Sequence, residues 1–209
     1  MLASLLLRLG ALGLLVFYGL IIAGGFMSPG YNHMTQSISE LGQAGAPTAR
    51  MFNYGLMAVG GAMILGGLGF FLGMRKLGGG VLMPVLAAVA IGLFGASFII
   101  GGLHPMPDPM NQAYGLVYAG VAAPFFAFLA LGDRSEVSGA KTLAVMSFLA
   151  SAVLLGIMMK VGGLNLVHKA DMGLWQRGLV AATTLWMVAA FLSIPGALAA
   201  KERRRSSTY

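Results

Sequence analysis

The sequence predicts an all-α fold: a bundle of six transmembrane helices with both termini in the cytoplasm and a short interfacial helix in the first outer loop. Three observations support this prediction. Hydrophobic residues make up 58% of the 209-residue chain, charged residues make up only 9%, and six separate runs are strongly apolar. A soluble domain carries roughly 25% charged residues. The composition therefore excludes a soluble globular protein and indicates an integral membrane protein.

Each predicted span is a run close to the roughly 20 apolar residues that cross a bilayer. The spans cover residues 9–28, 51–73, 81–103, 113–132, 142–160 and 174–199. They are joined by residues 29–50, 75–80, 104–112, 132–141 and 160–173. The chain shows no composition break and no fixed-period repeat, so we interpret residues 1–209 as a single membrane domain.

The first three spans carry local features that support their assignment. The first follows one basic residue, Arg8, and its apolar part exceeds the about 7–15 residues of a signal-peptide core, so we interpret it as an uncleaved helix. The second contains Gly69-x-x-x-Gly73 and the third contains Ala88-x-x-x-Gly92. Such spacing is typical of close helix contacts. We expect these contacts within the bundle, with homodimerisation as the alternative.

The last three spans are delimited by prolines, charges and an aromatic residue. Prolines in the loop 104–112 exclude a regular helix there and keep the backbone extended. The charged turn 132–141 precedes the fifth span. The sixth opens on GLWQRG, whose Trp175 is typical of the membrane interface. Pro124 and Pro195 lie inside the fourth and sixth spans, where a proline can break a helix.

The distribution of lysine and arginine predicts the orientation. With the N-terminus in the cytoplasm, nine basic residues fall on the inner side: Arg8, Arg75, Lys76, Arg134, Lys141, Lys201, Arg203, Arg204 and Arg205. Four fall on the outer side: Arg50, Lys160, Lys169 and Arg177. This excess follows the positive-inside rule and places both termini in the cytoplasm. The net charge of +7 thus reflects membrane orientation, and we interpret residues 201–209 as a basic cytoplasmic tail near anionic lipid, without a role in binding nucleic acid.

Polar residues gather on the predicted outer side. The histidines His33, His104 and His168 all fall there, together with Glu40, Asp108, Asp171, Asn32, Asn53, Asn111, Asn165, Gln112 and Gln176. Polar groups at membrane depth are costly unless they face protein or water. The pattern therefore predicts an outward-facing polar cup.

The motif SISELG lies in the first outer loop and has two interpretations. Ser37-x-x-Glu40 has the spacing of a capping box, in which each residue satisfies a backbone donor at the start of a helix. Ile38 and Leu41 would share one face of that helix, and Gly42 would end it. In the first interpretation, Glu40 is a structural cap or the partner of a basic side chain. In the second, it is a proton acceptor, a metal ligand or a ligand-binding carboxylate.

The motif HPMPDP also has two interpretations. His104 can be an interfacial residue at the end of the third span while Asp108 caps the fourth. Alternatively, the two side chains can meet across the turn as a histidine–carboxylate pair. Both interpretations stay open at the level of the sequence.

Arg177 lies about one turn into the sixth span, where a cation requires a partner. Glu40 is the best candidate on the same side, ahead of Asp108 and Asp171. We therefore predict a structural ion pair between Glu40 and Arg177 that ties the first outer loop to the last helix.

Three motifs together resemble those of a multipass membrane family known as domain of unknown function 998. These are PGYNHMTQSISELG after the first span, the Pro/Asp loop after the third and GLWQRG opening the sixth. The resemblance covers almost the whole chain, and SISELG followed by a helix near Asn53 is its most specific part. The family usually has an aromatic residue before the Pro–Asp loop, where this chain has His104, and often a histidine early in the fourth helix, where this chain offers Tyr114 or Tyr118. The resemblance implies a six-helix fold in a bacterial or archaeal membrane and supplies no reaction.

The polar cup supports three functional hypotheses. The first is a non-enzymatic membrane protein that binds or moves a lipid headgroup or a small solute. The second is an outer-leaflet hydrolase or transferase that uses histidine and carboxylate residues, with Ser37 or Ser39 as nucleophile or with a zinc ion. The third is a structural or accessory subunit that docks another membrane protein. We expect the plasma (inner) membrane as the location and favour a non-enzymatic role.

The candidate residues of the cup are named from the same pattern. They are His33, Ser37, Ser39, Glu40, Asn53, His104, Asp108, Asn111 and Arg177. Their catalytic roles are undefined. Candidate metal ligands are His33, His104 and His168, although no H-E-x-x-H motif is present, and we expect neither a metal nor another cofactor. The expected partners are membrane lipid, a small solute or another membrane protein.

Overall fold

The computed structural model describes residues 1–207, excluding the side chains of residues 112–114. Six α-helices follow one another: α1 (Leu2–Met27), α2 (Ala49–Lys76), α3 (Leu82–Leu103), α4 (Ala119–Leu131), α5 (Ser138–Met158) and α6 (Met172–Ser206). Four short 3₁₀ helices lie between them: η1 (Ile38–Gly42), η2 (Pro109–Tyr118), η3 (Ser135–Val137) and η4 (Val161–Gly163). The part of the chain that the structure describes contains no strand.

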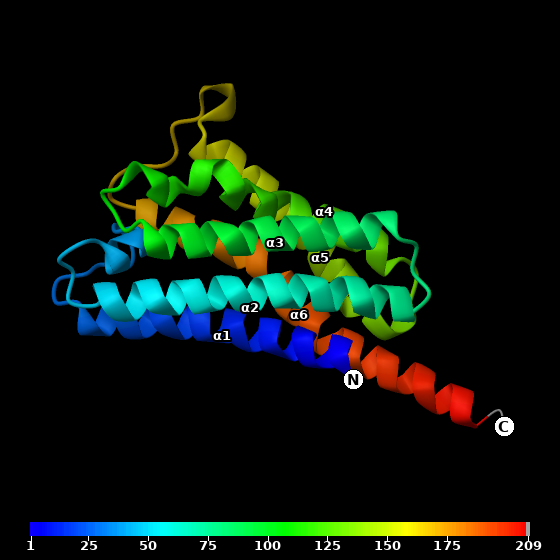
Figure 1. The fold of residues 1–209 in the computed structure, drawn as a ribbon. Helices are drawn as coiled ribbons and strands as arrows, with labels where there is room; N and C mark the ends of the chain where they lie inside the picture. The colour runs from blue at the N-terminus through cyan, green and yellow to red at the C-terminus, as the bar shows by residue number, and fades with distance from the viewer. Residues whose placement is uncertain (208–209) are drawn as a thin grey trace.

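The helices form an elongated bundle, with both termini at the same end (Figure 1). Six helical segments are long and apolar enough to cross a membrane, if the fourth is counted from Pro109 and the fifth from Ser135. The predicted all-α, six-span architecture is confirmed. We call the end formed by residues 28–48, 104–108 and 159–171 the polar end, and the opposite end, with both chain termini, the terminal end.

The first and last helices are longer than their predicted spans. α1 begins at Leu2, so Arg8 lies inside the helix and not before it. α6 runs for 35 residues to Ser206, about 52 Å at the usual rise. The predicted basic tail 201–209 is therefore a continuation of α6 as far as Ser206, because alanine, lysine, glutamate and arginine are strong helix formers. In Figure 1 this end of α6 projects beyond α1 and α2.

The fourth span is shorter as an α-helix than residues 113–132 predict. α4 has 13 residues, about 20 Å, against a hydrocarbon core about 30 Å thick. The preceding segment is the 3₁₀ helix η2, which starts at Pro109 and contains Gly115 at a φ of 80°. A positive φ suits glycine and interrupts a regular α-helix. The polar-end half of this span is consequently irregular.

Close contacts between small residues hold α1, α2 and α3 together. A Cβ added at Gly10 of α1 would lie 2.8 Å from the Cα of Gly66 in α2. A Cβ at Gly95 of α3 would lie 2.7 Å from the carbonyl oxygen of Gly60 in α2. These helices approach each other closely because glycine leaves room for the facing backbone.

The predicted small-residue motifs have mixed outcomes. Gly69 faces the backbone of Leu7 in α1, and a Cβ at Gly73 would lie 2.8 Å from Ile194 of α6, so both glycines make the predicted contacts within the bundle. Gly92 has open space around its Cβ position. Its predicted contact is therefore wrong, because Gly92 lies on the outward face of α3, whereas the carbonyl of Ala88 in the same motif does face Gly67 of α2.

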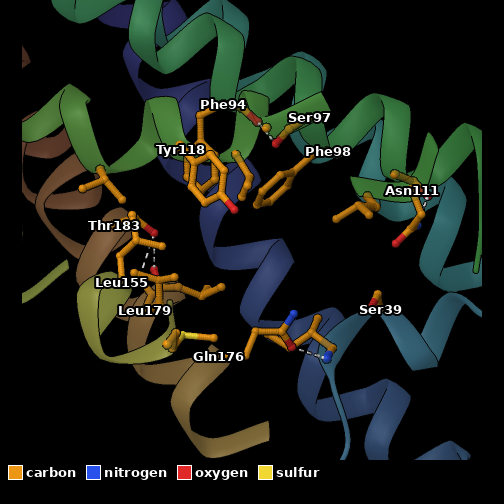
Figure 2. A pocket seen from close by; sticks show the side chains of 18 of the residues that line it. Ser39, Phe94, Ser97, Phe98, Asn111, Tyr118, Leu155, Gln176, Leu179 and Thr183 are labelled. Carbon is orange, nitrogen blue, oxygen red and sulfur yellow. Dashed lines mark hydrogen bonds between the residues drawn. The ribbon is translucent and has the colours of Figure 1, made fainter. Parts of the chain in front are cut away.

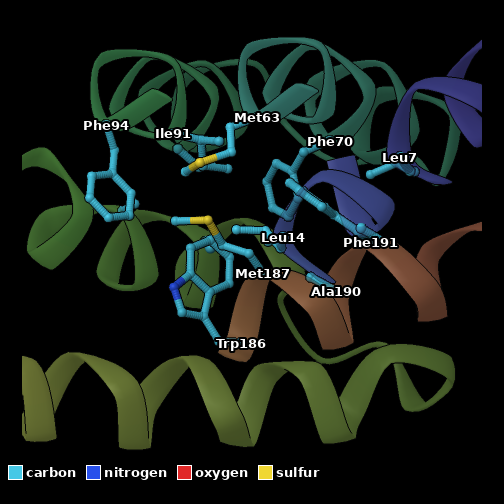
Figure 3. Packing of buried hydrophobic residues seen from close by; sticks show 14 of the residues in the cluster. Leu7, Leu14, Met63, Phe70, Ile91, Phe94, Trp186, Met187, Ala190 and Phe191 are labelled. Atoms are coloured by element: carbon cyan, nitrogen blue, oxygen red, sulfur yellow. The ribbon is translucent and has the colours of Figure 1, made fainter. Parts of the chain in front are cut away.

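The hydrophobic core lies between α1, α2, α3 and α6. Phe70, Phe94, Trp186 and Phe191 are among the largest fully buried side chains, and Figure 3 shows residues of these four helices packed together. Large hydrophobic side chains are also exposed along every spanning helix. This outward apolar surface suits hydrocarbon, as expected for a membrane protein.

Helix α5 packs closely only over the part nearer the terminal end. Its buried residues are all small: Ala140, Ala144, Ser147 and Ser151. Beyond Ser151 the helix has no buried residue. The polar-end third of α5 therefore stands away from the core, next to the irregular η2 segment of the fourth span.

Candidate functional site

The polar end is covered by η1 and its flanking loop, which we call the cap (residues 28–48). Ile38 and Leu41 are buried against the bundle, as their spacing predicts. The Thr48 hydroxyl donates to the carbonyl of Leu41 at 2.8 Å. The Asn53 side chain, one turn into α2, donates to the carbonyl of Gly42 at 2.9 Å. Asn53 thus anchors the cap and has a structural role there.

The capping box predicted from Ser37-x-x-Glu40 is present. Glu40 Oε1 accepts from the backbone N–H of Ser37 at 2.7 Å and from its hydroxyl at 3.0 Å. Glu40 Oε2 accepts from the Gln36 amide at 2.9 Å. Burial alone would raise the pKa of Glu40, but these hydrogen bonds and the nearby charge of Arg177 outweigh it, so the pKa is lowered. The carboxylate is therefore ionised, and its oxygens accept hydrogen bonds from the start of the short helix to which it belongs and from the preceding Gln36.

Arg177 ties the cap to α6 through backbone carbonyls. Its Nη1 donates to the carbonyls of His33 at 2.7 Å, Gln36 at 2.9 Å and Gly173 at 2.9 Å. Its Nη2 donates to the Tyr31 hydroxyl at 2.6 Å. That hydroxyl in turn donates to the carbonyl of Ser37 at 2.8 Å.

The predicted ion pair between Glu40 and Arg177 is not among the ion pairs of residues 1–207. The predicted link between the first outer loop and the last helix does exist, but its acceptors are different. The carbonyls and the Tyr31 hydroxyl already bond both Nη groups of the guanidinium, and the capping box already satisfies the carboxylate. The two charges therefore interact without direct contact, and Arg177 helps to lower the pKa of Glu40.

The three histidines lie in three separate settings. His33 lies edge-on to Tyr31 with ring centroids 5.2 Å apart, and burial followed by the charge of Arg177 lowers its pKa. His104 Nδ1 lies 2.9 Å from Asp108 Oδ2. His168 lies near Asp171, at 3.8 Å.

Within residues 1–207, outside the side chains of 112–114, no three His, Asp or Glu side chains form a group that could hold a metal ion. His33, His104 and His168 thus do not converge on one ligand set. The hydrogen bonds of the Ser37 and Ser39 hydroxyls involve each other, Glu40 and Met106, and no histidine. The structure consequently assembles no serine–histidine pair from these residues.

Asp108 takes both roles that the sequence left open. Its Oδ1 accepts from the N–H of Met110 at 2.8 Å, which caps η2, while its Oδ2 contacts His104. The hydrogen bond from His104 and then that from Met110 lower the pKa of Asp108. Asn111 closes the same turn, because its amide donates to the carbonyls of Gly101 at 3.1 Å and His104 at 2.9 Å.

Below the cap lies a cavity of about 720 Å³, lined by residues of η1, η2 and all six α-helices. Its wall is mainly apolar and is formed by Phe17, Ile38, Ser39, Phe52, Leu56, Phe94, Ser97, Phe98, Gly101, Pro109, Asn111, Gly115, Val117, Tyr118, Val121, Leu155, Met158, Met159, Gln176, Leu179, Val180 and Thr183. Figure 2 shows polar side chains from η1, η2 and α6 around this space. The described wall contains no charged residue.

Only two predicted cup residues, Ser39 and Asn111, line this cavity. The others are not part of its wall: His33, Ser37, Glu40, Asn53, His104, Asp108 and Arg177. Glu40 borders a separate, smaller hollow of about 310 Å³ within the cap. The predicted charged cup is therefore divided into a hydrogen-bonded cap above and an uncharged cavity beneath it.

The protein family described as "Protein of unknown function (DUF998)" matches residues 11–193. The chain belongs to this family. The match begins inside α1 and ends inside α6, and it confirms the resemblance seen in the three sequence motifs. No curated protein and no solved structure matches the chain significantly.

In this DUF998 chain, the cavity uses residues that the motif analysis did not select. Gln176 and Thr183 line it from α6, with Leu179 and Val180 between them. The spacing i, i+3, i+4, i+7 places these four residues on one helix face, so two polar residues, Gln176 and Thr183, on one face of an apolar span were the available signal. Of the two tyrosines considered in place of a histidine, Tyr118 lines the cavity, and the side chain of Tyr114 lies outside the described residues.

The polar groups of the cavity differ in how far they are satisfied. The hydroxyl of Ser97 donates to the carbonyl of Phe94 at 2.6 Å, and that of Thr183 to the carbonyl of Leu179 at 3.0 Å. Gln176 Oε1 accepts from the N–H of Ile38 at 2.6 Å. These bonds fix the wall of the cavity, and they leave the Gln176 amide nitrogen for another partner.

Proposed function

We propose that this protein binds a lipid-like amphiphile in the cavity beneath the cap and has no catalytic role. The observation that carries the proposal is the wall of the cavity, which combines an apolar surface with a few uncharged polar groups. Ligand pockets for small molecules typically have about 300–1,000 Å³ and this mixture of surfaces. The 720 Å³ cavity falls within that range.

The position of the cavity supports a ligand that comes from the membrane. Val117, Tyr118 and Met159 line it, and each is at least 42% exposed. These exposed residues mark an opening of the cavity at the surface of the bundle. It lies where α5 stands away from the core, on the side that faces hydrocarbon if the six helices span a bilayer.

We further propose that the polar end faces outward from the plasma membrane and that both termini lie in the cytoplasm. The support is the excess of nine lysine and arginine residues over four between the two ends of the bundle. The ligand would then be held in the outer half of the membrane. In this arrangement the cap separates the cavity from the external water.

The test compares two glycines of α3. Gly101 lines the cavity, and its Cβ position has only ordinary contacts, the nearest at 3.6 Å. Gly101→Leu should therefore fold and fill part of the cavity. Gly92 has open space at its Cβ position and does not line the cavity, so Gly92→Leu is the matched control.

Native mass spectrometry of protein purified in mild detergent provides the readout. We expect a bound amphiphile in the wild type and in Gly92→Leu, and its loss in Gly101→Leu with an unchanged melting temperature. A wild-type protein that retains no amphiphile and takes up none when lipids are added back would overturn the proposal. Equal retention in both variants would place the ligand outside the cavity.

A further inference from the structure

We infer that the ligand is an uncharged amphiphile with a single chain, whose headgroup carries hydroxyl groups, as in a glycerol monoester. The inference rests on the proposed function and narrows it to a chemical class. It depends on three features of the cavity: the charged groups next to its residues in the chain, the polar atoms left without partners, and the position of these atoms along the bundle axis.

Two charged groups that directly follow cavity residues in the chain, Arg177 and Glu40, have their hydrogen-bond partners outside the cavity. Arg177 follows Gln176 directly, yet it donates to carbonyls of the cap and of α6. Glu40 follows Ser39 directly, yet its carboxylate accepts from Ser37 and Gln36. A charged headgroup would meet no charged side chain among the described residues that line the cavity. Burying an unpaired charge is strongly unfavourable, so the site selects against charged lipids.

Three uncharged polar groups of the wall keep hydrogen-bonding capacity. Among the described residues, the Gln176 amide nitrogen, the Asn111 carbonyl oxygen and the Tyr118 hydroxyl have no partner, although the other halves of the two amides are occupied. Figure 2 shows the Gln176 nitrogen and the Tyr118 hydroxyl directed into the space. The set offers one donor, one acceptor and one group that does both. A hydroxyl headgroup, which donates and accepts, satisfies all three.

The polar atoms without partners lie mainly toward the polar end of the cavity, whereas the hydroxyls of Ser97 and Thr183 deeper in the wall donate to carbonyls of their own helices. Ser39 and Asn111 lie at the polar end, and Gln176 precedes Thr183 by seven residues of α6. Seven residues of helix span about 10 Å. Phe94 and Val121 line the cavity deeper in the bundle. A chain directed inward from the headgroup would therefore lie against apolar side chains, and the volume suits one chain with its headgroup.

The test uses three probes with the same oleoyl chain, each added to delipidated protein in detergent. They are 1-oleoylglycerol, which is neutral and has hydroxyl groups; methyl oleate, which is neutral and has no hydroxyl; and 1-oleoyl-lysophosphatidylglycerol, which is anionic. Binding is measured by native mass spectrometry over a concentration series. We expect 1-oleoylglycerol to bind at least 10-fold more tightly than either of the other two.

A pair of tyrosine variants tests the hydrogen-bonding groups. Tyr118→Phe removes a hydroxyl that has no partner in the described protein, so the fold should not change. One lost neutral hydrogen bond of about 1 kcal/mol corresponds to roughly 5-fold weaker binding of 1-oleoylglycerol. Tyr54→Phe is the control, because Tyr54 is exposed and does not line the cavity. It should leave binding unchanged.

The outcomes separate this inference from the proposed function. If none of the three probes binds, the proposed function itself fails. If the anionic probe binds as tightly as 1-oleoylglycerol, the cavity is a lipid site but the selection for neutral headgroups is wrong. If methyl oleate binds equally well, or if Tyr118→Phe has no effect, the assignment of the hydroxyl headgroup is overturned.

Discussion

Arg177 is the residue whose loss should most directly release the cap. Replacing it with methionine keeps the apolar stem of the side chain and removes all four hydrogen bonds of the guanidinium. Three of these bonds leave α6 and reach the cap, at the carbonyls of His33 and Gln36 and at the Tyr31 hydroxyl. We expect Arg177→Met to free the segment 31–42 from the sixth helix while the spanning helices stay folded.

The size of the effect follows from these contacts. Hydrogen bonds that involve a charged group contribute about 1.5–3 kcal/mol each. The Arg177 Nε–H is buried without a partner, which costs the wild type about 1–3 kcal/mol, and ordering the long side chain costs up to about 2 kcal/mol. The net loss for the cap is therefore about 2–4 kcal/mol. Because 1.4 kcal/mol is a factor of ten, the open state should become roughly 30- to 1,000-fold more populated.

Amide hydrogen exchange measures this local opening, because exchange of a protected amide follows the population of its open state. Peptides that cover residues 31–42 should exchange faster in Arg177→Met by the factor given above, while peptides from α2 should not change. Arg177→Lys keeps the charge but lacks the planar set of donors, so its effect should be intermediate. Arg50→Met is the control, because Arg50 is exposed at the same end.

Equal exchange of the segment 31–42 in wild type and Arg177→Met would refute the reasoning. It would mean that the buried Ile38 and Leu41 hold the cap without the arginine. Faster exchange across all helices would also contradict it, because that result would show global destabilisation and not a local opening.

Three further outcomes are expected. A Cβ at Gly173 would overlap the carbonyls of the cap, whereas one at Gly178 meets only Leu154 at 3.8 Å. Gly173→Ala should therefore lower the melting temperature by about 5 °C or more, while Gly178→Ala should leave it unchanged or raise it. Equal effects of the two variants would argue against the close approach of Gly173 to the cap. The pKa of Glu40 is lowered, so the stability that its carboxylate provides is complete above about pH 4.3, the pKa of an unfolded glutamate, and is lost as the pH falls through the folded pKa. Glu40→Gln should therefore make the melting temperature fall less steeply with decreasing pH. An unchanged slope would show that this group does not contribute. The chain has no cysteine, so single cysteines can report orientation: a membrane-impermeant maleimide should label Gln43→Cys in intact cells and Gly80→Cys only after permeabilisation, and the reverse pattern would invert the proposed topology.

Local signals in the sequence were sufficient for the helices and for the cap. Long apolar runs predict spanning helices because the hydrocarbon core leaves the backbone few other ways to satisfy its polar groups. Ser37 and Glu40 predict a capping box because both partners lie within one turn. The difference at the fourth span is also local in origin. Pro109 falls in the predicted loop 104–112 and Gly115 in the predicted span 113–132, whereas the structure places both residues in one 3₁₀ segment, η2.

The partners of Arg177 could not be derived in the same way. The sequence shows that a cation lies near the membrane at the polar end, and Glu40 is the opposite charge on that side. It does not show that two carbonyls of a folded loop and one of α6 converge on one position, because backbone carbonyls are present at every residue. A charged residue in a membrane sequence therefore indicates that a partner is needed, but it does not identify that partner.

The cavity is the least predictable feature, because residues from eight separate helical elements form it. Its polar members, such as Gln176 and Thr183, are ordinary polar residues on one face of an apolar span. The cavity exists because α5 stands away from the core beyond Ser151 and because the fourth span starts as a 3₁₀ helix. Both are consequences of packing between elements, which no single stretch of sequence encodes.

The length of α6 has a mechanical consequence. One helix carries Gln176 at the wall of the cavity and, about 40 Å further along its axis, the turn that contains Arg203, Arg204 and Arg205. The helix continues through Pro195, so its two ends belong to one element. If a ligand in the cavity tilts or rotates the part of α6 near Gln176, the arginines at the far end move with it. Binding in the cavity would then change the position of these arginines at the opposite surface of the membrane, without the displacement of any loop.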